Sequence, residues 1–427
     1  MKHVHRRSAR LAAAAAALVV TAGALAGCSS SGGGEETVVI KVAIQQETGA
    51  QKPYETVFAQ IEDMYPNIDI QASQYAADQL GTVMTTQLQA GNAPDLIWGS
   101  PGTGNTNSLG LYAQAGYLVD LSDQDWAVES ITESAKPLFY NGDELFALPL
   151  DLAPIPMIIN STAYEAAGLT PATTFDGVLE DCAVARESGA SLLNVAGAFA
   201  PQAGITALEL AATRVYRENP NWNQDRADGK TTFAETKGWK DTLNAFITLH
   251  ENQCFQDGVE GADGPQLFGS VASGQSLGTF VPAGAINDLR SQETGAEFAL
   301  ALFPGETEDD AYLFASPTDA FGLNAASTHP EEAMQVLEAF ATPEIRDALA
   351  ELTGNVSMET ALNGQPATGD FESLNDLLSD PDRNGPLANL FWPNGEVYST
   401  LGTGVQGLLT GQVTVDALLE ELDKSWG

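Results

Sequence analysis

One short segment has the spacing of a catalytic nucleophile. Gly274-Gln275-Ser276-Leu277-Gly278 fits G-x-S-x-G, a turn that presents a reactive serine between a strand and a helix. Asp319 and His329 follow in the chain order that such hydrolases use. Here, however, a helix-like PQLFGSVAS precedes the serine and a strand-like SLGTFV follows it. A serine hydrolase is therefore kept as an alternative, and the chain is predicted not to be an enzyme.

Other cofactor and metal patterns are weak. The glycine-rich GSPGTGNTNSLG lacks the lysine of a P-loop and the dinucleotide fingerprint. There is no HExxH, and His250 and His329 are far apart in the sequence, which gives a zinc site no support. The many carboxylates leave an oxygen-ligand calcium site open, although no EF-hand spacing is present. We expect no cofactor and no metal.

Polar side chains follow the first predicted strand, over 37–44. Gln45, Gln46 and Glu47 come directly after it, and Trp98 ends a later short strand. Ligands of α/β folds bind at the carboxyl ends of strands. Amide and carboxylate groups hydrogen-bond hydroxyls, and an aromatic ring covers an apolar face. These four residues are therefore predicted ligand contacts, with an ordinary solvated loop as the alternative for the first three.

The hydrophobic pattern supplies elements that would position these groups. Tyr54, Val57, Phe58 and Ile61 recur at helical spacing after the first strand. Strands and helices then alternate up to about residue 115, which predicts an α/β lobe with a mainly parallel sheet. Helix patterns dominate from 173 to 252, and further strands are predicted over 276–281, 298–303 and 320–325.

The N-terminus has the pattern of an export signal. Its first ten residues carry Lys2, Arg6, Arg7 and Arg10, and the apolar run that follows is shorter than the roughly 20 residues of a membrane span. Leu25-Ala26-Gly27-Cys28 resembles the bacterial lipobox, where the chain is cut before the cysteine and the thiol is lipidated. We expect a signal peptide over 1–27, a lipidated Cys28 and a flexible tether over 28–36. The alternative is an ordinary signal peptide with a chance cysteine.

The chain is strongly acidic, with 57 Asp and Glu against 18 Lys and Arg and a formal net charge of −39. Such a surface repels phosphate backbones and anionic lipid. Nucleic acid is therefore excluded as a partner, and the lipid on Cys28 would be the only membrane contact. About 390 residues remain after the tether, too many for one core, so two lobes are expected.

Two further cysteines, Cys182 and Cys254, lie in a chain bound for an oxidising compartment. A disulfide between them is predicted. It would close a loop of about 70 residues and stabilise by roughly 4 kcal/mol. Two buried free thiols are the alternative.

Six segments, in this order, resemble those of a known family. They are AGNAPDLIWG, AGYLVDLS, DELFALPLDLAPIPMIINSTAYEAAGL, VASGQSLGTFVPAG, FGLNAASTHPEEAMQVLEAFATPE and LLTGQVTVDALLEELDKSW. The chain resembles the extracellular solute-binding proteins of bacterial ABC importers, in particular the carbohydrate-binding, maltose-binding-like group. The resemblance spans about 38–427.

The resemblance implies a fold of two α/β lobes, each discontinuous, joined by three hinge crossings near 149, 302 and 355. The N-lobe would comprise 37–149 and 303–355, and the C-lobe 150–302 and 356–427. It also implies a monomer, lipid-anchored on the outside of a bacterial cell membrane, that binds a carbohydrate and delivers it to permease subunits. The strong acidity keeps a cationic solute, such as a polyamine or a basic peptide, as an alternative ligand.

The resemblance also points to single residues. Asp151 follows the first crossing, where the family often places ligand contacts. Tyr398 aligns with a stacking aromatic, and Trp392 lies close to it in the sequence. Ala153 and Ala283 stand where relatives often carry an acidic residue and a tryptophan, so the chain departs here from the family's usual sugar-stacking pattern.

Two further candidates complete the predicted site. Trp222 lies in a polar insertion that would line the cleft, and Asp319, with Thr318, begins the returning strand. Trp239 shares helical spacing with Leu243 and is predicted to pack in the core instead.

Overall fold

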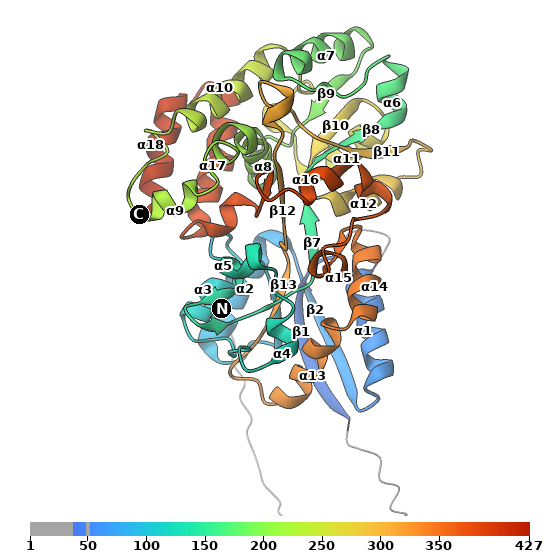
Figure 1. The fold of residues 1–427 in the computed structure, drawn as a ribbon, viewed down its shortest axis with the longest axis vertical. Coiled ribbons are helices and arrows are strands. Elements are labelled where there is room, and N and C mark those ends of the chain that lie inside the picture. The colour runs from blue at the N-terminus through green and yellow to red at the C-terminus, as the bar shows by residue number, and fades with distance from the viewer. Residues whose placement is uncertain (1–36, 48–51) are drawn as a thin grey trace, which may run out of the picture. The chain divides into compact units, whose positions relative to one another are not determined.

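The computed structural model describes residues 37–47 and 52–427. The signal peptide, Cys28 and the tether fall outside the described residues. The segment 37–427 forms one unit, in which two α/β lobes are joined by a small sheet (Figure 1).

The first lobe is built on a five-stranded sheet of order β2-β1-β3-β13-β6. Its strands are β1 (Val38–Gln45), β2 (Ile68–Tyr75), β3 (Leu96–Gly99), β6 (Leu148–Pro149) and β13 (Ala320–Leu323). β1 pairs in parallel with β2 and β3, whereas β13 is antiparallel to β3 and β6. The sheet is thus mixed rather than mainly parallel, because β13 enters it from the second lobe and runs back along β3.

The first helix shows how the predicted pattern becomes a packed element. Proline begins it, and Tyr54, Val57, Phe58 and Ile61 are all buried on one face, as their spacing predicts. The ring of Phe58 packs against Phe340, with 6.1 Å between their centroids. The helices of this lobe are α1 (Pro53–Met64), α2 (Ala77–Ala90), α3 (Leu109–Gln114), α4 (Asp125–Val128), α5 (Lys136–Phe139), α13 (Pro330–Phe340) and α14 (Pro343–Thr353).

The second lobe has a four-stranded sheet of order β11-β8-β10-β9. Its strands are β8 (Met157–Asn160), β9 (Ser191–Asn194), β10 (Ser276–Phe280) and β11 (Phe298–Ala301). β10 is parallel to β9 and antiparallel to β8, and β11 is antiparallel to β8. The predicted strands over 276–281 and 298–303 are therefore present.

Helices make up most of the second lobe, as the sequence predicts for 173–252. They are α6 (Ser161–Ala166), α7 (Phe175–Glu187), α8 (Ala200–Ala211), α9 (Trp222–Ala227), α10 (Lys237–Glu251), α11 (Gly264–Ala272), α12 (Ile286–Arg290), α16 (Asn375–Leu378), α17 (Gly395–Leu409) and α18 (Val415–Trp426). One π-helical turn, Ala212–Tyr216, continues α8.

A third sheet, of order β14-β7-β12-β15, lies between the lobes (Figure 1). Its strands are β7 (Asp151–Pro154), β12 (Leu313–Ser316), β14 (Val356–Ser357) and β15 (Asn384–Gly385). β7 directly follows β6 of the first sheet, β12 precedes β13, and β14 follows α14. The chain therefore passes between the lobes three times, and its second passage, β12, lies beyond residue 302.

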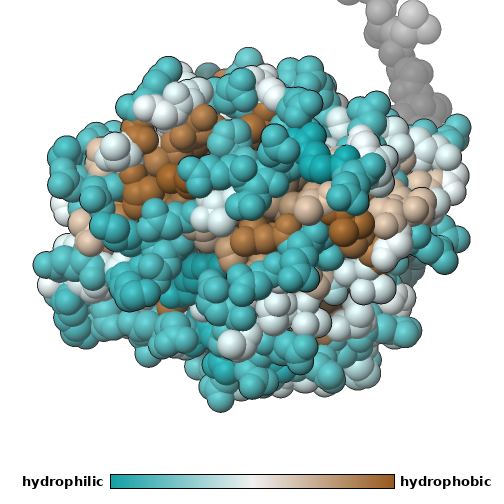
Figure 2. All heavy atoms as spheres, turned by 90° about the horizontal axis from the view of Figure 1, so that it is seen from above, coloured by the Kyte–Doolittle hydropathy of each residue, from teal (hydrophilic) through white to brown (hydrophobic). Residues whose placement is uncertain are grey.

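The outer end of the second lobe is mainly hydrophilic. Seen from above, polar side chains cover most of it, and apolar ones gather in hollows between them (Figure 2). Within the described ranges, no helix combines the length and apolar character that a membrane crossing requires.

Candidate ligand-binding cleft

A cavity of about 550 Å³ lies between the two lobes, beside the connecting sheet. The first lobe contributes the ends of β1 and β3, the start of α1, the residue before β13 and the end of α14. The second lobe contributes the segment after β10. The lining residues are Gln45, Gln46, Glu47, Pro53, Tyr54, Trp98, Pro282, Gly284, Ala285, Asn287, Asp288, Arg290, Ser291, Glu293, Asp319, Leu352, Thr353 and Asn355.

The polar groups that follow β1 line this cavity. Glu47 is held in place: its Oε1 accepts the backbone N–H of Tyr54 at 2.9 Å and its Oε2 accepts Nε2 of Gln74 at 3.2 Å. Lys52 Nζ donates to the backbone oxygen of Glu47 at 2.9 Å. Burial raises the pKa of the Glu47 carboxyl above its ordinary value. Gln45 and Gln46 keep their amide groups free of any hydrogen bond to the described residues, so they can serve a ligand.

Trp98 lines the cavity, but little of its ring is available. Its side chain is 6% exposed, and its Nε1 donates to the hydroxyl of Tyr54 at 2.8 Å. Tyr54 is 7% exposed, and burial raises its pKa well above the ordinary value. The two hydrogen-bonded side chains form part of the cleft wall and leave little open ring surface for stacking.

Two carboxyl groups lie near one another at the hinge. Asp319 lines the cavity at the start of β13, and Asp151 is buried behind the wall, 1% exposed. Burial and the charge of Asp151 raise the pKa of Asp319 to about 8. Asp151 Oδ2 accepts hydrogen bonds from Thr353 Oγ1 at 2.7 Å and Asn355 Nδ2 at 3.0 Å, and burial raises the pKa of this carboxyl too.

The wall from the second lobe is formed by the loop after β10 and by α12. Burial raises the pKa of Asp288. Arg290 binds both oxygens of Asp370, at 2.7 and 2.8 Å, which directs its charge away from a ligand. Gly284 donates its N–H to Asn355 Oδ1 at 3.1 Å, so this wall is tied to the hinge.

Three predicted aromatic contacts are not in the cleft. Trp222 and Trp392 are 2% and 0% exposed, and both pack in a cluster of aromatic rings inside the second lobe with Trp239 and Phe233. Tyr398 donates its hydroxyl to the backbone oxygen of Pro201 at 2.6 Å and lines no part of the cavity. Trp222 and Trp392 have so little exposed surface that they build the core, Tyr398 is half-buried, and none of the three lines this cavity, so the prediction that they contact a ligand there is wrong.

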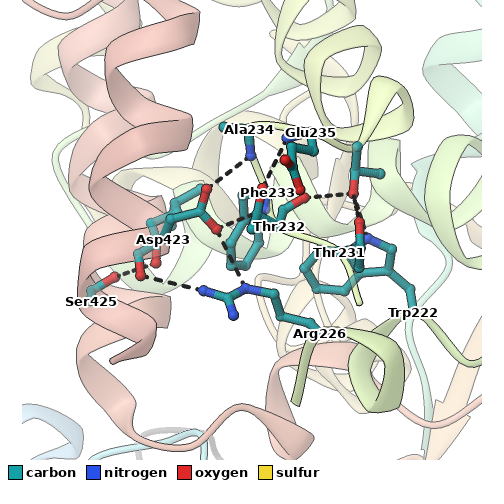
Figure 3. Close-up of polar contacts among 11 residues, drawn as sticks. Trp222, Arg226, Thr231, Thr232, Phe233, Ala234, Glu235, Asp423 and Ser425 are labelled. Carbon is teal, nitrogen blue, oxygen red and sulfur yellow. Dashed lines mark hydrogen bonds and ion pairs between the residues drawn. The ribbon is translucent and has the colours of Figure 1, made fainter. Parts of the chain in front are cut away.

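A carboxylate explains why the polar insertion around Trp222 folds inward. Asp423, on α18, accepts the backbone N–H of Phe233 at 2.8 Å and of Ala234 at 3.0 Å, and lies 3.4 Å from Nε of Arg226 (Figure 3). Trp222 Nε1 donates to Thr236 Oγ1 at 2.8 Å. The insertion thus covers the aromatic cluster instead of reaching the cleft.

The sequence reasoning missed both the second-lobe wall and the hinge residues. Asn287 and Asp288 lie on α12 and Ser291 directly after it, well beyond the end of β10 at Phe280, so the strand-end argument used for β1 does not reach them. Thr353 and Asn355 lie at the third crossing, which was expected near 355. Tyr54 was assigned to helix packing alone.

The remaining sequence candidates have plain structural positions. Cys182 and Cys254 are joined by a disulfide, and both are 0% exposed. Ser276 begins β10 after α11, the reverse of the strand–turn–helix order, and its Oγ is buried 2.7 Å from Ser191 Oγ. Among the described residues, no group of three or more potential ligands is placed to hold a metal ion.

A larger cavity, of about 910 Å³, lies inside the second lobe between α7, α9 and α10. It touches neither the strand ends nor the first lobe. Its guanidinium, Arg214, is bound to Glu306 at 2.7 Å and lies over the ring of Phe175. The smaller cavity between the lobes is therefore the better candidate for the functional site.

The fold has close counterparts among solved structures. RafE, a solute-binding protein solved in complex with raffinose, matches with a TM-score of 0.74 and 20% identity over 91% of this chain and 99% of that one. The unliganded RafE of Streptococcus pneumoniae matches with a TM-score of 0.70, 20% identity and coverage of 92% and 100%. A sugar transporter of Bacillus licheniformis in complex with stachyose matches with a TM-score of 0.71, 18% identity and coverage of 91% and 98%.

Comparisons of the sequence alone give a match to a family model. The search of curated proteins gives no match. The family described as "Bacterial extracellular solute-binding protein" matches residues 45–347, which is most of the chain. The two-lobe fold, the three crossings and this match lead to one conclusion: the chain belongs to the family of bacterial extracellular solute-binding proteins.

Proposed function

We propose that this protein captures a sugar or oligosaccharide between its lobes and delivers it, unchanged, to the permease subunits of an ABC importer. The observation that carries the proposal is the cavity between the lobes, which is lined from both sides by amide, hydroxyl and carboxyl groups. The raffinose and stachyose complexes of similar folds support the same ligand class.

The chemistry of the lining suits a sugar. Gln45 and Gln46 from one lobe and Asn287 from the other can each donate to and accept from hydroxyl groups. A ligand that contacts both walls is bound completely only when the lobes close on it, so it stabilises the closed form. The crossings β7, β12 and β14 are where such a hinge motion would take place.

We also propose how the chain divides between the lobes. The boundaries near 149 and 355 follow the sequence analysis, and the boundary expected at 302 is placed at β12. Phe303 supports this change because its ring packs against Phe280 and Phe175 of the second lobe, with centroids 5.1 and 6.4 Å apart.

The remaining parts of the proposal concern the protein's location. A signal peptide over 1–27 would export the chain, and lipid on Cys28 would hold it at the outer side of the bacterial cell membrane. The protein would act there as a monomer, with the tether over 28–36 giving it reach to the permease.

A thermal-shift screen tests the ligand class. The mature domain is heated with raffinose, stachyose, xylo-oligosaccharides and chitin oligosaccharides, and in parallel with spermidine, a basic peptide and an ester substrate. Bound sugar raises the unfolding temperature, because a ligand that binds only the folded chain stabilises it. A shift with spermidine or the peptide alone contradicts the proposal, and so does ester turnover that Ser276→Ala abolishes.

A pair of variants tests whether the sugar that raises the unfolding temperature binds in the cleft. Glu47→Ala removes a cavity-lining carboxylate and should weaken sugar binding about tenfold, since loss of a buried hydrogen-bond partner costs roughly 1–3 kcal/mol. Glu55→Ala, an exposed position on the neighbouring helix, is the matched control and should bind as the parent protein does. Equal sugar affinities for the two variants would show that Glu47 and its cavity do not bind the sugar.

A further inference from the structure

The cavity between the lobes has an excess of carboxyl groups. Glu47, Asp288, Glu293 and Asp319 line it, and the one basic side chain among its described lining residues is Arg290. The Nη1 and Nη2 atoms of Arg290 both donate hydrogen bonds to the carboxylate of Asp370, which lies outside the cavity. The cleft therefore holds more acidic than basic side chains.

Three of the four cavity carboxyl groups, those of Asp288, Glu293 and Asp319, accept no hydrogen bond from the described residues, and Asp319 is the one of these that lies beside a second buried carboxyl, Asp151. Glu47 has Lys52 beside it and accepts two hydrogen bonds. The Asp319 carboxyl accepts no hydrogen bond from the described residues, although its backbone oxygen accepts the N–H of Leu150 at 3.1 Å. The donors closest to the hinge, Thr353 and Asn355, are used by Asp151 Oδ2.

The surroundings of Asp319 disfavour its ionised form unless a cation is bound beside it. Asp151 is 1% exposed, and its Oδ1 is buried without a hydrogen-bond partner in the described part of the chain. The Tyr54 hydroxyl accepts the N–H of Trp98, and it donates no hydrogen bond to either carboxyl among the described residues, although the charges of both raise its pKa. Two carboxyl groups in one poorly solvated place cannot both ionise cheaply unless a positive charge joins them.

The cleft offers little surface for stacking. Its only aromatic lining residues in the described ranges are Tyr54 and Trp98, and both are at most 7% exposed. Ala283, at the end of the second-lobe wall, adds no ring. Recognition must therefore depend on polar and charged contacts more than on the apolar face of a sugar ring.

We infer that the cleft selects a saccharide that carries a protonated amino group, with the Asp319 carboxylate as the counter-ion of that group. This inference rests on the proposed function, because it names the ligand class of the same cleft. The amides of Gln45, Gln46 and Asn287 favour an amino sugar over a linear polyamine, since hydroxyl groups give these amides both donors and acceptors.

Binding of such a ligand is linked to a proton. Burial and Asp151 raise the pKa of Asp319 to about 8, so this carboxyl holds its proton in an empty cleft at about pH 6. A bound ammonium group favours the ionised carboxylate. The proton of the carboxylic acid then leaves to solvent, the ammonium keeps its own, and the ion pair forms without any change in covalent bonds.

Calorimetry with two forms of one sugar chain tests the inference. Chito-oligosaccharides of two to four units are titrated at about pH 6 as free amines and, separately, as the fully N-acetylated forms. The same titrations in phosphate and in Bis-Tris, two buffers of different ionisation enthalpy, give the number of protons released. The parent protein, Asp319→Asn and the exposed control Asp309→Asn are compared, and thermal unfolding checks that each is folded.

The expected result is at least tenfold tighter binding of the amine form by the parent and by Asp309→Asn, with release of close to one proton. In Asp319→Asn the preference should fall below about threefold and the proton release should vanish. Equal affinity for the two forms in the parent, or an unchanged preference for the amine form in Asp319→Asn, overturns the inference. In either case, binding of a neutral sugar leaves the proposed function intact. If neither form binds and no neutral sugar of the thermal-shift screen binds either, the proposed function fails together with this inference.

Discussion

Asn355 Nδ2 donates to Asp151 Oδ2 at 3.0 Å, and this contact joins the third crossing to the first. The other end of the same amide accepts the N–H of Gly284 at 3.1 Å, in the wall that the second lobe contributes. One side chain thus connects two hinge segments and the far side of the cleft. Movement of the lobes must either carry this set of contacts along or break it.

We predict that Asn355→Ala changes the hinge more than the fold of either lobe. It removes one donor from the buried Asp151 carboxyl and frees Gly284, at a cost of roughly 1–3 kcal/mol. Sugar affinity should change several-fold, and small-angle scattering of the unliganded protein should show a different mean separation of the lobes. Asn363→Ala, an exposed site whose amide contacts only Glu359, is the control, and identical behaviour of the two variants would contradict the role of Asn355.

Asp423→Ala should destabilise the second lobe by about 2 kcal/mol, since hydrogen bonds to a charged group contribute roughly 1.5–3 kcal/mol. The variant loses the acceptor for two backbone N–H groups and the partner of Arg226. Urea unfolding measures the change. Asp416→Ala is matched to it on the same helix, because its pair with Lys240 is exposed and worth less than about 1 kcal/mol. Equal losses in both variants would contradict this difference.

The disulfide between Cys182 and Cys254 should stabilise the mature domain. It closes a loop with a sequence separation of 72, for which the chain-entropy estimate is roughly 4 kcal/mol. The Cys182→Ser/Cys254→Ser double variant should therefore unfold at a lower urea concentration. Thiol titration of the unfolded, non-reduced domain should find no free thiol, and two reactive thiols would disprove the bond.

Stability should depend on pH through Asp319. Its pKa is raised to about 8 in the folded chain by burial and by Asp151, whereas the unfolded value is near 3.9. The folded state therefore binds more protons between these values, so this group's contribution to stability is complete below about pH 4 and is lost as the pH rises through 8. In Asp319→Asn, the decline of the unfolding free energy from pH 5 to pH 9 should be smaller than in the parent, and parallel profiles would contradict the assignment.

Cys28→Ala should release the protein from membranes or block its processing. The reason is the lipobox-like sequence before Cys28, since a single acylated residue would be the only anchor. Fractionation of cells that express the full chain measures the outcome. A variant that is cut normally and stays in the membrane fraction would show that the lipid is not on this residue.

Sequence patterns predicted the first-lobe side of the cleft better than the second. Gln45, Gln46 and Glu47 could be placed because a buried strand ends just before them, and ends of neighbouring strands meet at one sheet edge. The same rule applied to β10 gives Val281 and Pro282, whereas Asn287 and Asp288 lie further along the chain, on α12. Asp151 was expected as a direct contact, whereas the structure buries it behind Thr353 and Asn355, a distinction that depends on tertiary packing.

The tryptophans show why residue type alone is a poor guide. Trp222 lies among polar residues in the sequence, which suggested a cleft position. The segment around it is instead held by hydrogen bonds to Asp423 and Thr236, and it covers an aromatic core. Long-range pairing of this kind, across about 190 residues, leaves no local trace in the sequence.

Isothermal titration calorimetry of the mature domain, with the sugars that shift its unfolding temperature, shows whether the cavity between the lobes binds a saccharide. We expect one site per chain, a negative heat-capacity change from burial between the lobes, and an affinity about tenfold weaker in Glu47→Ala but unchanged in Glu55→Ala. Absence of heat with every saccharide, aminated or neutral, together with saturable binding of spermidine or the basic peptide, would contradict saccharide binding in this cavity.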